Sequence, residues 1–201
     1  MKKLLIIIFL LTGISFYNCE PCHFADVPAY FDVKGFRITH LVRDGFLSRP
    51  SIANETMSFW DYYGLKIDFI VDYISYQKAE NNSKFSTVTI LNACSPPDPG
   101  EKGSKSEKIE SIKVTSVFPF DSLHLSGAEI NDLLFTDGMF LDSFIHTNRD
   151  RLIPYDEIEL KIQGRGPDLF IIELGYFQLK TKIVLTNGEQ YESVSDTIRF
   201  W

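Results

Sequence analysis

Long stretches of the chain alternate between apolar and polar residues, the pattern of β-strands that bury one face. The strictest alternation runs over residues 65–76, where Leu65, Ile67 and Phe69 share one parity and polar residues fill most of the other. Strand-forming residues fill six further segments. The predicted strands cover residues 30–43, 65–76, 85–93, 109–118, 155–163, 176–186 and 191–200.

Glycine-containing turn signals separate or bend these strands. The apolar parity changes at Gly35, which predicts a β-bulge, and Asp44-Gly45 predicts a turn. Asn187-Gly188 lies between two alternating segments and predicts a hairpin in which both residues take positive φ. Many short strands joined by such turns favour a mainly β fold, an antiparallel immunoglobulin-like sandwich or open barrel.

One short helix is expected after residue 125. Ser126 and Glu129 have the spacing of a capping box, and Ile130, Leu133 and Leu134 follow at helical spacing. Asp137-Gly138 is expected to end this helix, while residues 139–150 fit neither period clearly.

Residues 95–107 contain no apolar side chain other than proline, and we expect an exposed, mobile loop there.

The N-terminus has the layout of a secretory leader. Lys2 and Lys3 precede an unbroken apolar run over residues 4–11, too short to span a bilayer, and Cys19 follows soon after. The pattern predicts a signal peptide over 1–18, a tether over 19–29 lipidated at Cys19, and one β-rich domain over 30–201. The alternative is a secreted protein cut nearby without a lipid.

The net charge limits the classes of partner. The chain of 201 residues carries −7, and loss of Lys2 and Lys3 with the leader, which holds no acidic residue, leaves −9. An acidic domain is a poor match for nucleic acid or for anionic lipid surfaces, since both need clustered Lys and Arg. We therefore expect no nucleic-acid partner, and attachment to a membrane only through the N-terminal lipid.

Two further cysteines would follow Cys19 into an oxidising compartment. Cys22 lies in the tether, and Cys94 follows the predicted strand 85–93. A Cys22–Cys94 disulfide would pin the tether to the domain. The alternative is a small buried thiol at Cys94 and a free one at Cys22.

The chain resembles the uncharacterised lipoprotein domains of Gram-negative, gut-type bacteria. The likeness rests on four stretches: Cys19-Glu-Pro-Cys22, residues 30–36 (Tyr-Phe-Asp-Val-Lys-Gly-Phe), residues 126–135, and residues 177–189. The resemblance implies a mainly β outer-membrane lipoprotein of unknown role, on either membrane face, and it transfers no catalytic residue.

No sequence motif indicates catalysis, a metal or a cofactor. The histidines lack metal-ligand spacing, and we expect His40 in or beside the core. A hydrolase site assembled from distant residues stays an alternative. The aromatic residues Trp60, Tyr62 and Tyr63 are the candidate ligand platform, on which a sugar ring could stack. The favoured alternative is that they cap one end of the core, where large aromatic residues are usual.

Ser122 and Thr197 each follow an Asp and precede an aliphatic residue, a short pattern for bacterial O-glycosylation.

The expected function is a non-catalytic binding or structural module of the cell envelope, with a glycan or an envelope protein as its partner. A glycan-binding accessory protein of a surface polysaccharide system is the second reading.

Overall fold

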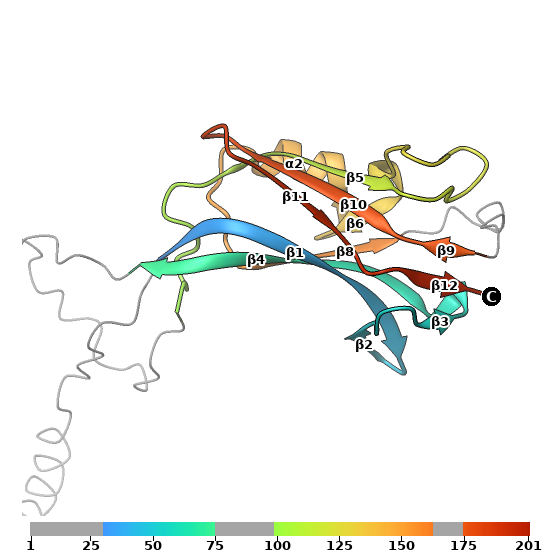
Figure 1. The fold of residues 1–201 in the computed structure, drawn as a ribbon. Coiled ribbons are helices and arrows are strands. Elements are labelled where there is room, and N and C mark those ends of the chain that lie inside the picture. The colour runs from blue at the N-terminus through green and yellow to red at the C-terminus, as the bar shows by residue number, and fades with distance from the viewer. Residues whose placement is uncertain (1–29, 75–98, 163–174) are drawn as a thin grey trace, which may run out of the picture.

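A computed structural model describes residues 30–74, 99–162 and 175–201, which form layered β-sheets (Figure 1). The largest sheet has the strand order β2-β1-β4-β8-β6-β7. Its members are β1 (Tyr30–Asp44), β2 (Leu47–Pro50), β4 (Tyr62–Ile74), β6 (Leu134–Thr136), β7 (Met139–Phe140) and β8 (Glu157–Ile162).

Two smaller sheets complete the architecture. The first, of order β11-β10-β5, contains β5 (Ile109–Ser116), β10 (Leu179–Leu185) and β11 (Gln190–Val194). The second, of order β3-β12-β9, contains β3 (Thr56–Met57), β9 (Tyr176–Phe177) and β12 (Ile198–Phe200). All strand pairs except β12–β3 are antiparallel. The predicted mainly β, sandwich-like class with one short helix is confirmed.

β1 and β4 form the longest pair, and the predicted bulge near Gly35 is confirmed. Val33 pairs with Val71 and Gly35 with Ile70, so Lys34 is the extra residue on β1. The bulge shifts the parity of the strand, and Phe31, Val33, Phe36 and Ile38 consequently all face the core. The turn expected at Asp44-Gly45 joins β1 to β2.

The hydrophobic core lies between the inner face of β1 and β4 and the sheet of β5 and β10 (Figure 1). Ile67, Val114 and Ile183 are fully buried in it. The hydroxyl of Tyr191 on β11 donates to the carbonyl of Val33 on β1 at 3.1 Å. These contacts bury the apolar parity of β1, β5 and β10, whereas Val194 on β11 is 51% exposed.

The hairpin at Asn187-Gly188 is confirmed, but its turn differs from the expected one. Leu185 N donates to Glu189 O at 2.9 Å, and only Gly188 of the predicted pair has positive φ, at 90°. The loop is therefore a three-residue turn with a glycine bulge, not a two-residue turn. The strand expected over 191–200 divides at Ser195, and β12 enters a different sheet.

The helix expected after Ser126 is wrong. Gly127 has φ +82°, and Ser126 Oγ donates to Val117 O instead of capping a helix. Residues 126–130 run along β5, where Ile130 N donates to Val114 O at 2.9 Å. Only a single 3-10 turn, η2 (Asn131–Leu133), follows, because β5 takes the backbone groups that a helix would need.

The expected exposed loop is only partly correct over residues 99–107, because Glu101, Lys102, Lys105 and Ser106 are exposed but the backbone of the segment is docked. Phe31 N donates to Gly103 O and Lys105 N to Phe31 O, so this segment docks beside β1. Ser104 is buried, and its hydroxyl donates to Glu107 O at 2.7 Å and accepts from Ile153 N at 3.1 Å. Backbone and hydroxyl hydrogen bonds hold this polar segment in place of apolar packing.

Three predictions lie outside the described residues: the leader and tether over 1–29, the strand over 85–93, and the start of the loop over 95–98. Among the residues that the structure describes, no helix is long and apolar enough to cross a membrane.

Candidate functional site

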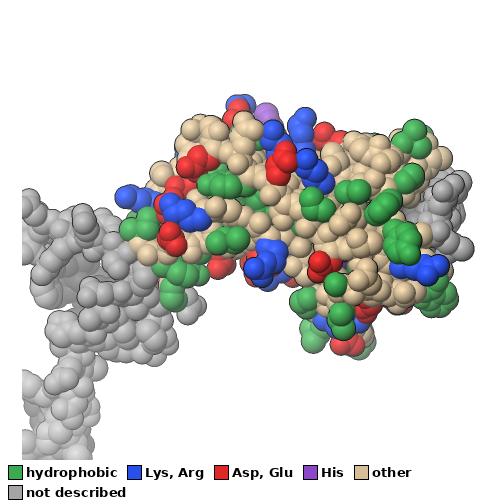
Figure 2. Space-filling view, in the orientation of Figure 1, with side chains coloured by type: hydrophobic (Ala, Val, Ile, Leu, Met, Phe, Trp, Pro, Cys, Tyr) green, Lys and Arg blue, Asp and Glu red, His purple; other side chains and the backbone are tan. Residues whose placement is uncertain are grey.

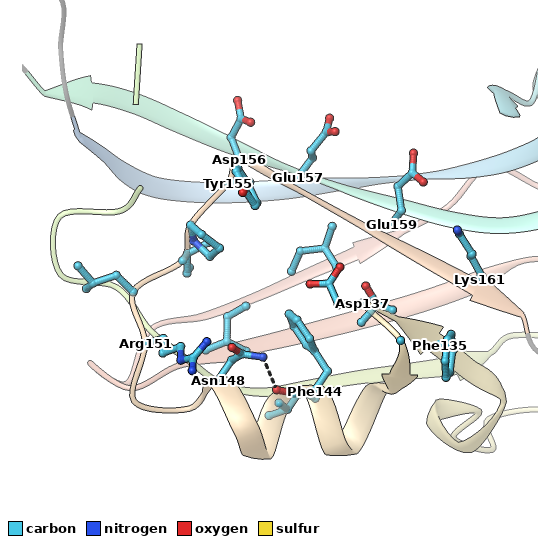
Figure 3. A pocket seen from close by; sticks show the side chains of 18 residues that line it. Phe135, Asp137, Phe144, Asn148, Arg151, Tyr155, Asp156, Glu157, Glu159 and Lys161 are labelled. Carbon is cyan, nitrogen blue, oxygen red and sulfur yellow. Dashed lines mark hydrogen bonds between the residues drawn. The ribbon is translucent and has the colours of Figure 1, made fainter. Parts of the chain in front are cut away.

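A groove of about 850 Å³ opens where the largest sheet splits (Figure 3). β6 pairs with β8 only at Leu134–Ile162 and Phe135–Lys161. The chain then turns at Asp137-Gly138, with φ values of 47° and 80°, and returns as β7. This two-residue turn has positive φ at both central positions, a geometry that Asp-Gly adopts readily. The turn takes the chain away from β8, and the groove occupies the place where β6 would have continued.

The backbone of β8 faces this groove along Glu157 and Glu159. Phe69 N donates to Asp156 O at 2.7 Å, which fixes the parity of the β4–β8 ladder. Because backbone groups alternate in direction along an antiparallel strand, Ile158 and Leu160 bond to β4, whereas Glu157 and Glu159 direct their N–H and C=O groups into the groove. No strand among the described residues pairs with this stretch on the groove side.

The opposite wall is the helix α2 (Leu141–Asn148), in the segment that the sequence left ambiguous. Leu141, Phe144 and Ile145 recur at helical spacing, and the first two are buried. Phe144 points from the helix into the groove, and Asn148 Nδ2 donates back to its carbonyl at 2.9 Å (Figure 3). The helix lacks a side-chain N-cap, since Phe140 occupies that position, which is why the usual start signal was absent.

The groove has an apolar floor and a mainly acidic rim, in which the carboxylates of Glu157 and Glu159 stand on the outer face of β8 and point away from the cavity (Figure 3). The apolar lining side chains include Ile109, Phe144, Ile145, Leu152, Ile153 and Ile158. The charged lining side chains are Asp137, Asp156, Glu157, Glu159, Arg151 and Lys161. Carboxylates outnumber cations, so the rim favours a ligand with positive charge.

Neighbouring groups already engage part of this rim. Glu157 accepts from Lys66 on β4 at 2.5 Å, and Glu157 and Asp68 together raise the pKa of Lys66. Lys161 lies over the ring of Tyr63, with Nζ 5.1 Å from its centroid, and the Tyr63 hydroxyl raises the pKa of Lys161. Glu159 has no ion-pair partner within 4 Å among the described residues.

The candidate aromatic platform does not form one surface. Trp60 is 66% exposed, whereas Tyr62 is 5% exposed and packs edge-on against Phe177 and Phe200. The ring of Tyr63 lies under Lys161. The interpretation of all three residues as a stacking surface is therefore wrong for Tyr62, which belongs to the core. Figure 2 shows hydrophobic side chains on the projecting end that β2 forms, where Phe46 and Leu47 are exposed.

The core position expected for His40 is confirmed. The imidazole is 1% exposed, with Nδ1 2.8 Å from Tyr62 Oη and Nε2 2.7 Å from Ser195 Oγ. Burial lowers the pKa of His40 to about 4, despite the Asp196 carbonyl 3.0 Å from Nε2. A neutral ring satisfies every contact if Tyr62 donates to Nδ1 and the Nε2–H points at Ser195 and Asp196.

This distant Ser–His pair is the arrangement that a hydrolase would need, but its surroundings point to a structural role. Ser195 is 4% exposed, and its Oγ also accepts from Leu179 N at 3.0 Å and donates to Asp196 O at 2.9 Å. A substrate carbonyl would have to enter the core to reach this hydroxyl. The pair instead connects β1 to the segment between β11 and β12.

A second histidine cluster is mostly buried, with the side chains of His124 and Asp121 only 12% and 11% exposed. His124 Nδ1 is 2.9 Å from both carboxylate oxygens of Asp121, and Nε2 is 3.1 Å from Asp132. Burial opposes ionisation of the Asp121 carboxyl, but the His124 side chain and the backbone N–H groups of His124 and Leu123 together hold its pKa below the ordinary value. In the part of the chain that the structure describes, no group of three His, Cys, Asp or Glu side chains is arranged to hold a metal.

Of the remaining predicted site residues, Ser122 and Thr197 are described by the structure and the three cysteines are not. Ser122 is exposed and Thr197 is half-buried, so a glycan could reach the former more easily. Cys19, Cys22 and Cys94 lie outside the described residues, and both the lipid and the disulfide stay predictions.

Comparisons with protein-family models, curated proteins and solved structures find no match for this chain.

The groove residues were not identified from sequence. The available signal was Asp137-Gly138, which fits a hairpin turn as well as the end of a helix.

Proposed function

We propose that this chain is a non-catalytic binding module of the cell envelope, held at the outer membrane by a lipid on Cys19. Its ligand site is the groove between β8 and α2. The observation that carries the binding role is the combination of an apolar floor, formed around Phe144 and Ile158, with a rim of Glu and Asp side chains. Concave sites with apolar walls and a few directed polar groups are typical of ligand binding.

The groove fits a protein ligand better than a sugar. Its lining offers a strand edge and the exposed or half-buried aliphatic side chains of Ile145, Leu152 and Ile158. Its aromatic members other than the largely buried Phe144 are Phe135 and Tyr155. Aliphatic side chains pack against the apolar side chains of a polypeptide, whereas sugar rings stack on exposed aromatic faces. An envelope protein is therefore the proposed partner.

Site-directed photo-crosslinking in cells tests this function. A photoreactive phenylalanine replaces Tyr155, which lines the groove and is 70% exposed, or Tyr176, an exposed control on β9 outside the groove. We expect a discrete crosslinked protein from position 155 and none from position 176. Equal crosslinking from both positions, or none from either, would overturn the groove as the binding site.

Glycan binding is the second candidate, and the exposure of Trp60 favours it. The indole is 66% exposed, beside the half-buried Phe59. A single exposed indole can stack on one sugar ring. We expect Trp60→Ala to abolish any signal on a glycan array if this candidate holds, and unchanged signal would eliminate it.

A further inference from the structure

We propose that the ligand of the groove is an extended polypeptide segment that adds a strand to β8 and carries the pattern basic–apolar–basic. This inference rests on the proposed function and names the chemistry of its partner. Three features support it: the direction of the β8 backbone groups, the parity of its side chains, and the charge of the rim.

The backbone of β8 supplies the first argument. Glu157 and Glu159 each direct one N–H and one C=O into the groove, since Ile158 and Leu160 bond to β4. A segment running antiparallel to β8 would lie in line with β6. It would occupy the positions opposite Glu157 and Glu159, which β6 does not reach because the chain turns at Asp137-Gly138. Strand addition at such an edge satisfies main-chain groups on both partners.

The side chains of β8 set the sequence of the ligand. Residues directly opposite on neighbouring strands share one face of the sheet. Ligand residues opposite Glu157 and Glu159 would therefore lie beside those carboxylates, and the residue between them, opposite Ile158, would face the apolar floor. Phe144, Ile145 and Ile153 line that floor.

The charge of the rim selects Lys or Arg at the two outer positions. Glu157 shares its carboxylate with Lys66, whereas Glu159 has no ion pair among the described side chains, so Glu159 is the stronger partner. Asp137 and Asp156 add negative charge at either side of the groove (Figure 3). Acidic edge residues also discourage pairing with the acidic bulk of a second copy of this chain, whose net charge is −7.

Hydrogen exchange with synthetic peptides tests the proposal on the mature chain. The probes are Ac-Gly-Ser-Lys-X-Lys-Ser-Gly-NH₂ peptides with Val, Leu, Phe or Trp at X, supplied at about 1 mM, near the weak limit of specific binding. We expect at least one of them to slow exchange of the Glu157 and Glu159 amides by about tenfold or more. The Ile158 and Leu160 amides already bond to β4, so their exchange is the internal control.

Altered peptides separate strand pairing from charge attraction. Methylation of both lysine backbone nitrogens removes the N–H groups that would donate to β8, and we expect it to abolish protection. Replacement of both lysines by Glu should weaken binding by about tenfold or more, since like charges would then face each other.

Matched protein variants complete the test. Glu159→Lys should weaken peptide binding by about tenfold, and Glu101→Lys, on the exposed surface of the docked segment, should leave it unchanged. Glu159→Pro removes a groove-facing N–H but no β4 bond, and should reduce binding relative to Glu159→Ala. The peptide variants keep the proposal testable if Glu159→Pro fails to fold.

The outcomes distinguish this inference from the proposed function. Suppose that the peptides bind and that Glu159→Lys weakens this binding, but that they protect neither the Glu157 nor the Glu159 amide. That result would overturn strand addition and leave the groove as a binding site. No protection by any of the four peptides would also overturn it, whereas the photo-crosslink at position 155 reports separately on the groove. If the Glu157 and Glu159 amides become protected without peptide as the protein concentration rises, the occupant of the groove is a second copy of this chain. That result would overturn the proposed basic–apolar–basic ligand.

Discussion

The imidazole Nε2 of His40 on β1 lies 2.7 Å from the hydroxyl of Ser195, a residue 155 positions further along the chain. Tyr62 holds the other ring nitrogen at 2.8 Å, and all three side chains are buried. This buried neutral histidine joins the two ends of the described domain and makes its stability depend on pH.

Acidification is expected to destabilise the fold through His40. Burial lowers the pKa of His40 to about 4, below the ordinary value of 6.5, so the unfolded chain binds the proton first as the pH falls. Stability is therefore lost as the pH falls from about 6.5 to 4, and unfolding should cost about 2 kcal/mol less at pH 5 than at pH 7. Urea denaturation at the two pH values measures the difference.

The variant His40→Gln provides the control for this prediction. Glutamine does not titrate, so the stability difference between pH 7 and pH 5 should shrink by about 2 kcal/mol, even though the variant is less stable overall. Both pH values lie above the ordinary range of Asp and Glu, which limits the contribution of the carboxyl groups. Identical pH dependence in the two proteins would contradict the assignment.

Asn131 substitutes for a neighbouring strand at the edge of β5. Its Oδ1 accepts from Val114 N at 3.0 Å, and its Nδ2 donates to Ile112 O at 2.8 Å and to Asp142 at 2.9 Å. Asn131→Leu would leave buried backbone groups unpaired, and we expect a loss of about 2–4 kcal/mol in the free energy of unfolding. Asn131→Asp keeps the acceptor for Val114 but would place a carboxylate against Asp142 and the Ile112 carbonyl, so it should destabilise the fold as well. A loss below about 1 kcal/mol in Asn131→Leu would argue against this role.

Gly103 holds the docked segment against the chain near Ile153. Its φ is +82°, and an added Cβ would lie 2.4 Å from the Ile153 carbonyl oxygen, whereas an added Cβ at Gly45, with φ +65°, meets nothing within 4 Å. Both alanine variants incur the cost of the left-handed conformation, about 1 kcal/mol or more. We expect Gly103→Ala to lower the melting temperature clearly further than Gly45→Ala, and equal shifts would mean that the segment is not docked.

Most of the fold could be predicted from local sequence patterns. The alternation around Ile67 and Phe69 predicted β4, and the parity change at Gly35 predicted the bulge, because both signals depend on near neighbours in the sequence. Two of the local errors had one origin: Ser126 and Glu129 fit a helix cap, and Asp137-Gly138 was then interpreted as the end of that helix. The backbone of β5 competed for the same residues, and such tertiary competition leaves no local signal.

The candidate site was beyond prediction because it depends on which strands pair. The groove exists because β6 leaves β8 after Phe135, and no property of Glu157 or Glu159 alone shows that one edge of their strand lacks a neighbour. The pairing of His40 with Ser195 likewise joins residues far apart in sequence. Helix α2 did have a signal in Leu141, Phe144 and Ile145, but Phe140 replaces the polar cap that marks a helix start.

The proposed anchor predicts a change of cellular fraction. Acyl chains on Cys19 would supply the membrane affinity, since the chain without its predicted leader would carry −9 and be repelled by anionic lipid. Cys19→Ser should move the protein from the detergent-extracted membrane fraction to the soluble periplasmic fraction, whereas Cys22→Ser should leave it in the membrane. Fractionation followed by immunoblotting measures both variants. Mature Cys19→Ser protein that still sediments with membranes would show that contacts other than the lipid hold it there.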